Sequence, residues 1–166
     1  MQNNLILQKT ERILSMKTCI QYLNQICLQK RDFGILIFRL IFGGMFIWHG
    51  FPKITGGIET WTALGQTMGV FGIHFAPAFW GFMSGCSEFI GGLLLFLGLF
   101  YRFASALLAI NLLTAFSSQM LQDKGLFKAS QSLEDASSVF AAVFIGPGRF
   151  SLDSYLGFIQ SKHTSL

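Results

Sequence analysis

Two ionisable residues, Arg39 and Glu88, interrupt otherwise apolar stretches of the chain. A charged side chain at the centre of a bilayer costs about 2.5–3.5 kcal/mol on insertion scales, so each residue needs a partner or a task. On adjacent antiparallel helices the two would lie at similar depth. We expect a buried ion pair that fixes helix register or, alternatively, a polar pocket for a head group such as a quinone carbonyl, or a proton relay. In a third alternative, one of them extends to the membrane surface.

His49 and Lys53 lie one helical turn apart where the first apolar stretch ends. Together they could transfer protons or bind a ligand at the mouth of such a pocket. The simpler interpretation of His49 is an interfacial histidine bonded to backbone. Asn111 begins a polar stripe in a later apolar stretch, and this stripe favours hydrogen bonding between helices over a binding site. The stripe continues with Thr114, Ser118 and Gln122.

Small residues share a predicted helical face with Glu88, namely Gly81, Gly85 and Gly92. Glycines at such spacing let another helix approach closely, so we expect them to form a helix-packing groove.

No metal site or thiol centre is predicted. His49 has no second ligand at metal-binding spacing. Cys19, Cys27 and Cys86 have no paired spacing, which disfavours a disulfide framework, a zinc site and a thiol-redox pair.

The composition indicates that lipid covers these elements. Of the 166 residues, 52% are hydrophobic and only 12% are charged, whereas soluble domains carry about 25% charge. The mean hydropathy is +0.53. The net charge of +4 comes from Lys and Arg that mostly flank apolar segments, a pattern typical of membrane topology signals. Nucleic-acid binding is therefore not expected, since it needs a basic exposed face.

The hydropathy pattern predicts an all-α fold with four transmembrane helices in one antiparallel bundle. The first span begins at Phe33 and ends near Phe51, where Gly50 and Pro52 break it. A long connection over residues 53–75 follows, with a short helix expected over residues 59–68. Glu134 and Asp135 are expected to open the fourth span and favour its N-terminal dipole. The later segments are a second span over 76–100, a third over 103–121, a polar loop over 122–131 and a fourth span over 133–145.

The ends of the chain are expected to flank this membrane domain. Residues 1–32 form either an amphipathic helix on the membrane surface or a loosely ordered tail, and Met16 offers an alternative translation start. Residues 157–166 form a C-terminal tail. The excess of Lys and Arg on one side predicts cytoplasmic termini in an inner membrane, with residues 53–75 and 122–131 outside.

Several motifs, taken together, resemble the DoxX family over about residues 33–156. They are Arg39-Leu40-Ile41-Phe42-Gly43-Gly44, Trp48-His49-Gly50-Phe51-Pro52-Lys53, Glu88-Phe89-Ile90-Gly91-Gly92, and Gly146-Pro147-Gly148-Arg149-Phe150-Ser151-Leu152-Asp153. The resemblance implies a four-helix membrane bundle. Some members of this family are small subunits of membrane oxidoreductases, including thiosulfate:quinone oxidoreductase, and others belong to complexes that handle thiol and oxidative stress.

The expected function is therefore an accessory subunit of a quinone-linked membrane oxidoreductase. No intrinsic cofactor is expected, and a quinone is the one cofactor that the pocket would take. The alternative is a non-enzymatic interaction or assembly protein that binds membrane partners, or further copies of itself, through its glycine-rich faces. A transporter is less favoured, because four short spans offer no paired broken helices.

Overall fold

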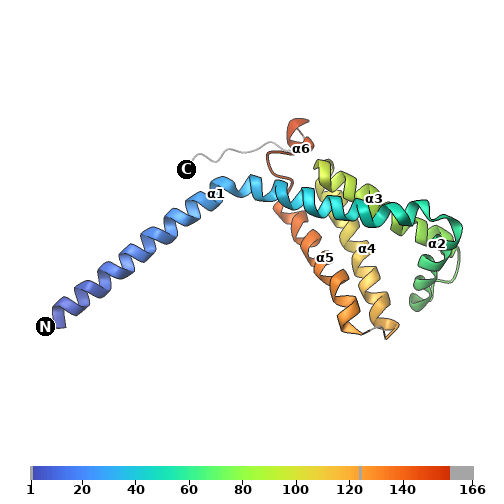
Figure 1. Cartoon of the computed structure of the whole chain (residues 1–166), viewed down its shortest axis with the longest axis horizontal. Helices are drawn as coiled ribbons and strands as arrows, with labels where there is room; N and C mark the ends of the chain where they lie inside the picture. Colours follow the sequence, from blue (N-terminus) through green and yellow to red (C-terminus); the bar gives the residue numbers. More distant parts are fainter. Residues whose placement is uncertain (1, 124, 158–166) are drawn as a thin grey trace.

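The computed structural model describes residues 2–123 and 125–157, and the regular secondary structure in this part of the chain is all helical (Figure 1). The predicted all-α class is confirmed. The elements are α1 (Gln2–Thr55), α2 (Gly57–Gly65), the 3₁₀ helix η1 (Gln66–Phe71), α3 (Pro77–Leu97), α4 (Tyr101–Leu121), α5 (Leu126–Ile145) and α6 (Leu152–Tyr155).

Helix α1 is a single continuous helix that passes both residue 32 and Pro52. Its N-terminal part extends away from the other helices (Figure 1), and the side chains of residues 16–27 are exposed. The prediction that Gly50 and Pro52 end this helix is wrong. A proline removes one N–H from the helical ladder, but here the helix continues to Thr55 and carries Lys53 over α3.

Helices α1 and α3 run antiparallel and pack closely through glycines. A Cβ atom on Gly43 would lie 2.7 Å from the backbone nitrogen of Phe96, and one on Gly92 would lie 2.7 Å from Cβ of Phe46. A Cβ on Gly50 would overlap the backbone of Phe89. These contacts fix the register of the pair, because residue numbers fall along α3 as they rise along α1.

The short helix α2 packs against the start of α3. A Cβ on Gly81 would overlap the carbonyl of Trp61, and one on Gly65 would overlap the carbonyl of Pro77. The Trp61 indole also donates to the carbonyl of Lys53 at 2.8 Å. The long connection expected over residues 53–75 is therefore largely helical and is held against both α1 and α3.

Helix α5 is longer than predicted and begins at Leu126, so the expected polar loop over residues 122–131 is much shorter. Glu134 and Asp135 lie in the interior of the helix, and the prediction that they open it is wrong. Alanines and a valine form the buried face of α5, namely Ala129, Ala136, Val139 and Ala142. Small side chains there let α5 lie directly along α4 (Figure 1).

The helices form two antiparallel pairs, α1 with α3 and α4 with α5, which meet near the α3–α4 turn and diverge away from it (Figure 1). Leu95, Tyr101, Leu108 and Val139 form a buried core where the pairs meet. In the part of the chain that the structure describes, three helical segments are long and apolar enough to cross a membrane: Lys30–Thr55, Pro77–Leu97 and Tyr101–Leu121. Helix α5 carries Lys128, Glu134 and Asp135 and is not among them. The chain is thus a multi-pass membrane protein of helical pairs rather than a clear four-helix bundle.

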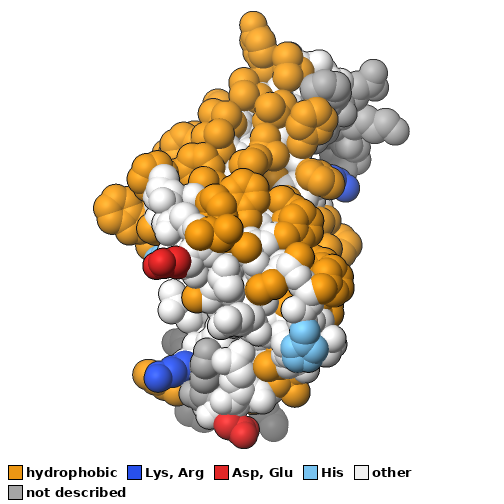
Figure 2. Space-filling view, turned by 90° about the vertical axis from the view of Figure 1, so that its right-hand side faces the viewer, with side chains coloured by type: hydrophobic (Ala, Val, Ile, Leu, Met, Phe, Trp, Pro, Cys, Tyr) orange, Lys and Arg blue, Asp and Glu red, His pale blue; other side chains and the backbone are white. Residues whose placement is uncertain are grey.

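The molecular surface also separates apolar from polar side chains. Hydrophobic side chains cover the upper part of the face in Figure 2, whereas charged and polar side chains gather in its lower part.

Candidate functional site

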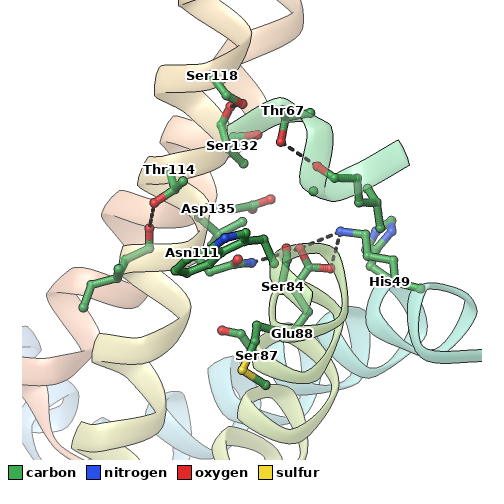
Figure 3. Close-up of a pocket in the computed structure, with 18 of the residues that line it drawn as sticks. His49, Thr67, Ser84, Ser87, Glu88, Asn111, Thr114, Ser118, Ser132 and Asp135 are labelled. Carbon is green, nitrogen blue, oxygen red and sulfur yellow. Dashed lines mark hydrogen bonds and ion pairs between the residues drawn. The ribbon is translucent and has the colours of Figure 1, made fainter. Parts of the chain in front are cut away.

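A polar cavity lies between the two diverging helix pairs and is closed on one side by α2 and η1 (Figure 3). Its volume is about 690 Å³. Its polar lining comes from α1, α3, α4, α5 and η1: His49, Lys53, Thr67, Ser84, Ser87, Glu88, Asn111, Thr114, Ser118, Gln119, Gln131, Ser132 and Asp135. Side chains distant in sequence are therefore brought to one space.

Glu88 is the central charged group of this cavity and is only 5% exposed. The ammonium group of Lys53 donates to both of its carboxylate oxygens, at 2.6 and 2.5 Å. The amide nitrogen of Asn111 donates to Oε1 at 3.2 Å. The carboxylate is thus neutralised by α1 and hydrogen-bonded by α4, so the ion pair links three helices around one wall of the cavity.

The predicted ion pair between Arg39 and Glu88 is wrong. In the observed register Gly43 faces Phe96 and Gly50 faces Phe89, so Arg39 lies level with the end of α3. This separates it from Glu88 by roughly twelve residues along the helix, or about 18 Å at about 1.5 Å per residue. The expected match of depths assumed that the first span ends near Phe51. Because α1 continues to Thr55, Lys53 takes the place opposite Glu88.

Arg39 is 2% exposed and donates only to backbone carbonyls in the hydrogen bonds described. Its Nε and Nη2 atoms donate to Leu95 and Phe96 at the end of α3, at 3.2 and 3.0 Å. Its Nη1 atom donates to Pro147 at 3.1 Å and to Phe150 at 2.7 Å. Arg39 therefore joins α1, α3 and the segment after α5, and it takes no part in the cavity.

The segment after α5 is fixed from a second side by Asp153. Its two carboxylate oxygens accept from the backbone N–H groups of Phe100 and Tyr101 at 2.8 and 3.0 Å. These groups open α4, so Asp153 acts as an N-terminal cap supplied from a distant part of the chain. Gly98 has a positive φ of 67° and lies against the Arg39 guanidinium, where a Cβ would overlap it. This structural cluster was not predicted, although the sequence Gly146–Asp153 stood out as a motif.

The remaining predicted residues divide between cavity and packing. His49 is exposed, lines the cavity and interacts electrostatically with Asp135 on α5. Gly85 lies against Lys53, with a Cβ position 3.1 Å from that of the lysine, whereas Gly81 contacts α2 and Gly92 contacts α1. Gln122 is not among the cavity-lining residues.

Sequence reasoning missed other cavity residues. Gln119 donates to the Ser132 hydroxyl at 3.0 Å, which links α4 to α5 across one end of the cavity. Trp80 also lines the cavity, and its indole N–H is buried without an acceptor among the described residues. Ser132 and Asp135 lie on the polar face of α5. The polar residues of this segment were interpreted as a loop and the start of a helix rather than as the interior of a helix.

The arrangement can bind a polar group through charged and neutral donors, and it can move protons between Lys53, Glu88 and their neighbours. Lys53 and Asn111 offer N–H donors, whereas Glu88 offers an acceptor. Within the described residues, no group of three or more His, Cys, Asp or Glu side chains is placed to hold a metal ion.

Comparison with known proteins supports a family assignment. A family model described as DoxX matches residues 34–120, which include Lys53, Glu88 and Asn111. A Bacillus subtilis (strain 168) protein named "Putative oxidoreductase CatD" is 33% identical over 84 residues, which are 51% of this chain and 58% of that protein. The chain thus matches less than two thirds of that relative's length. No solved structure matches the chain.

Proposed function

Because this chain belongs to the DoxX family, we propose that it is an accessory subunit of a quinone-linked membrane oxidoreductase and binds a quinone head group in its polar cavity. A quinone bound there would accept or donate electrons and protons in exchange with a partner enzyme. The partner would handle sulfur, thiol or oxidative-stress substrates. The name of the Bacillus subtilis relative, an oxidoreductase, is consistent with this assignment.

The observation that carries the proposal is the Lys53–Glu88–Asn111 group on the wall of a cavity between apolar helices. Ionisable groups within a membrane are costly and usually mark a functional site. An ion pair that only fixed helix register would pack best without open space beside it. Here the space is about 690 Å³, within the range of about 300–1,000 Å³ typical of small-molecule pockets.

The donors around the cavity suit a quinone carbonyl. Lys53 and Asn111 bring N–H donors to the wall of the cavity, and Phe46, Leu107 and Ile110 add apolar lining for the ring.

We further propose that α5 is a fourth span of an inner-membrane protein with cytoplasmic termini. Its 20 residues extend about 30 Å as a helix, enough to cross the hydrocarbon core. It starts beside the end of α4, and the segment after it is bound by Arg39 near the start of the first span. Asp135 and Ser132 line the cavity rather than the lipid, which lowers the cost of placing this polar helix in a membrane, whereas the exposed Glu134 retains its cost.

The pocket is tested by quinone binding to the full-length chain purified in mild detergent. Decylubiquinone and menadione are the probes, and isothermal titration measures their dissociation constants. Glu88→Gln should weaken binding about tenfold, because it removes the charge that positions the Lys53 ammonium group, and Asn111→Leu should do the same, because it removes an N–H donor worth roughly 1.5 kcal/mol. Glu134→Gln is the matched control, since Glu134 is exposed on α5 and does not line the cavity.

Equal binding by wild type, Glu88→Gln and Asn111→Leu would refute the pocket. Should Glu88→Gln lower the yield of folded protein, Asn111→Leu still decides, since it leaves the Lys53–Glu88 ion pair in place. Recovery of an oxidoreductase with the tagged chain from solubilised membranes is expected for the accessory role, and recovery of the chain alone would contradict it.

A further inference from the structure

A second cavity lies at the opposite end of the α1 span from the polar cavity. It has a volume of about 510 Å³ and is lined by Arg31, Gly34, Ile35, Phe38, Tyr101 and Ile145. Its walls are almost wholly apolar. Gly34 and Ile145 are exposed, so the groove is open to the surroundings of the helices. A Cβ added to Gly34 would meet no atom within 4 Å, and the groove therefore has free space beside this residue.

Arginine side chains from two helices gather at one rim of this groove. The Arg31 Nη2 atom donates to the carbonyl of Ile145, the last residue of α5, at 3.3 Å. The Arg102 Nη2 atom lies 3.8 Å from the Cβ position of Gly146, the next residue. Both guanidinium groups thus lie at the C-terminal end of α5, whose carbonyl dipoles favour cations.

The rim keeps a positive balance. Arg31 and Arg102 are exposed, and Arg149 follows close by, also exposed. The acids in this region are Asp32, whose Oδ1 accepts the backbone N–H of Arg149 at 3.2 Å, and the buried Asp153, which accepts from the backbone N–H groups of Phe100 and Tyr101. With the buried Arg39, four arginines therefore stand against two carboxylates. The 3.3 Å bond is the one hydrogen bond described for the Arg31 and Arg102 side chains, so most of their N–H donors are free for an anion.

We propose that this groove binds one anionic phospholipid, with an acyl chain along Gly34, Ile35 and Phe38 and the phosphate between Arg31 and Arg102. The arrangement matches the two halves of such a lipid, because an apolar slot on the helix surface ends at exposed guanidinium groups. Basic pockets between transmembrane helices on the cytoplasmic side bind anionic head groups in this way. Arginine suits phosphate through its planar set of donors. The site is independent of the quinone pocket.

Lipid binding to the full-length chain in detergent tests the proposal, measured by native mass spectrometry and by the midpoint of thermal unfolding. Dioleoylphosphatidylglycerol should bind and raise the midpoint. Dioleoylphosphatidylcholine, which has the same chains, and inorganic phosphate, which has none, should do neither. The double variant Arg31→Gln/Arg102→Gln should bind the anionic lipid about 25-fold more weakly, since each basic residue near an anionic surface contributes roughly fivefold.

Matched variants separate the two parts of the site. Lys128→Gln removes an exposed cation on α5 away from the groove and should leave lipid affinity unchanged. Gly34→Leu should fill the groove and weaken binding, whereas Gly44→Leu adds the same side chain to open space elsewhere on α1. Equal affinity for the two lipids, retention of affinity in the double variant, or an equal effect of inorganic phosphate would overturn the proposal. If the double variant does not fold, full lipid affinity in Gly34→Leu overturns it.

Discussion

Arg39 and Glu88 are both buried charges, but the chain stabilises them in different ways. The guanidinium of Arg39 has several donors in a planar fork, and four backbone carbonyls accept from it. The carboxylate of Glu88 can only accept, and Lys53 and Asn111 supply its donors. The arginine therefore fixes the fold, whereas the glutamate leaves a charged pair beside open space.

Substitution of Arg39 should destabilise the protein strongly. Arg39→Lys keeps the charge but cannot reach acceptors on two separate segments, so we expect a loss of about 2–4 kcal/mol in the free energy of unfolding. Unfolding of the purified protein in mixed detergent micelles measures this loss. Lys128→Gln, which removes an exposed charge, should change stability by less than about 0.5 kcal/mol. An Arg39→Lys protein as stable as wild type would show that the four carbonyl bonds contribute little.

Glu88, Lys53 and Arg39 could be selected from the sequence as candidate structural or functional residues, because a charged side chain in or next to an apolar stretch is costly unless it has a partner. The sequence alone did not allow them to be paired. Pairing depends on the register between α1 and α3, and a helix that continues one turn past Pro52 changes which residue lies opposite the acid. Trp80 gave no signal at all, since a buried N–H without an acceptor is visible only in three dimensions.

At the scale of elements, glycine placement sets the contact between α1 and α3. The neighbouring residues Gly43 and Gly44 show this directly, because only Gly43 faces α3. A Cβ there would lie 2.7–2.8 Å from the backbone and Cβ of Phe96, and backbone cannot move aside as a flexible side chain can. A Cβ on Gly44 would meet nothing within 4 Å.

Alanine at these two positions should have opposite effects. Gly43→Ala forces the helices apart, and we expect it to lower the free energy of unfolding by about 1–3 kcal/mol, as for other overpacked sites. Gly44→Ala should raise it by about 0.5–1 kcal/mol, because alanine favours a helix over glycine. The same micelle unfolding experiment compares them. Equal effects of the two substitutions would mean that the close contact does not limit stability.

The helices themselves were largely predictable from hydropathy, but their ends were not. The second and third apolar stretches became α3 and α4 close to the expected bounds. Helix α5 was cut short in the prediction because Lys128, Glu134 and Asp135 suggested a loop and a helix start. In the structure Asp135 lines the polar cavity and Lys128 and Glu134 are exposed, so none of the three is buried among the apolar side chains of the core.

At the scale of the whole molecule, two helix pairs that meet at one end and diverge at the other create the polar cavity. Arg39, Gly98 and Asp153 hold the closed end together, and α2 with η1 covers the open end (Figures 1 and 3). The family assignment expected from the motifs is confirmed by the match over residues 34–120. Neither composition nor motifs could have predicted the divergence of the pairs, because it depends on long-range packing.

The proposed topology places Gln122 outside the cell and Tyr155 in the cytoplasm. With Cys19, Cys27 and Cys86 replaced by serine, a single cysteine at Gln122 should react with a membrane-impermeant maleimide added to intact cells. A single cysteine at Tyr155, which is exposed, should react only after the membrane is permeabilised. Labelling of the Tyr155 position in intact cells would show that α5 does not cross the membrane.

The hydrogen bonds that Arg39 donates to backbone carbonyl groups also constrain the order in which the protein assembles during synthesis. Pro147 and Phe150 follow Arg39 by 108 and 111 residues, so ribosomes make these acceptors only after α1, α3, α4 and α5 have been synthesised. Until then, part of a cationic group within an apolar helix has no permanent partner. The nascent protein therefore stays incomplete until the last segment docks. In a chain truncated after α5, the Nη1 atom of Arg39 would lack the carbonyl acceptors of Pro147 and Phe150. Membrane proteases and insertion factors could recognise this unpaired charged group.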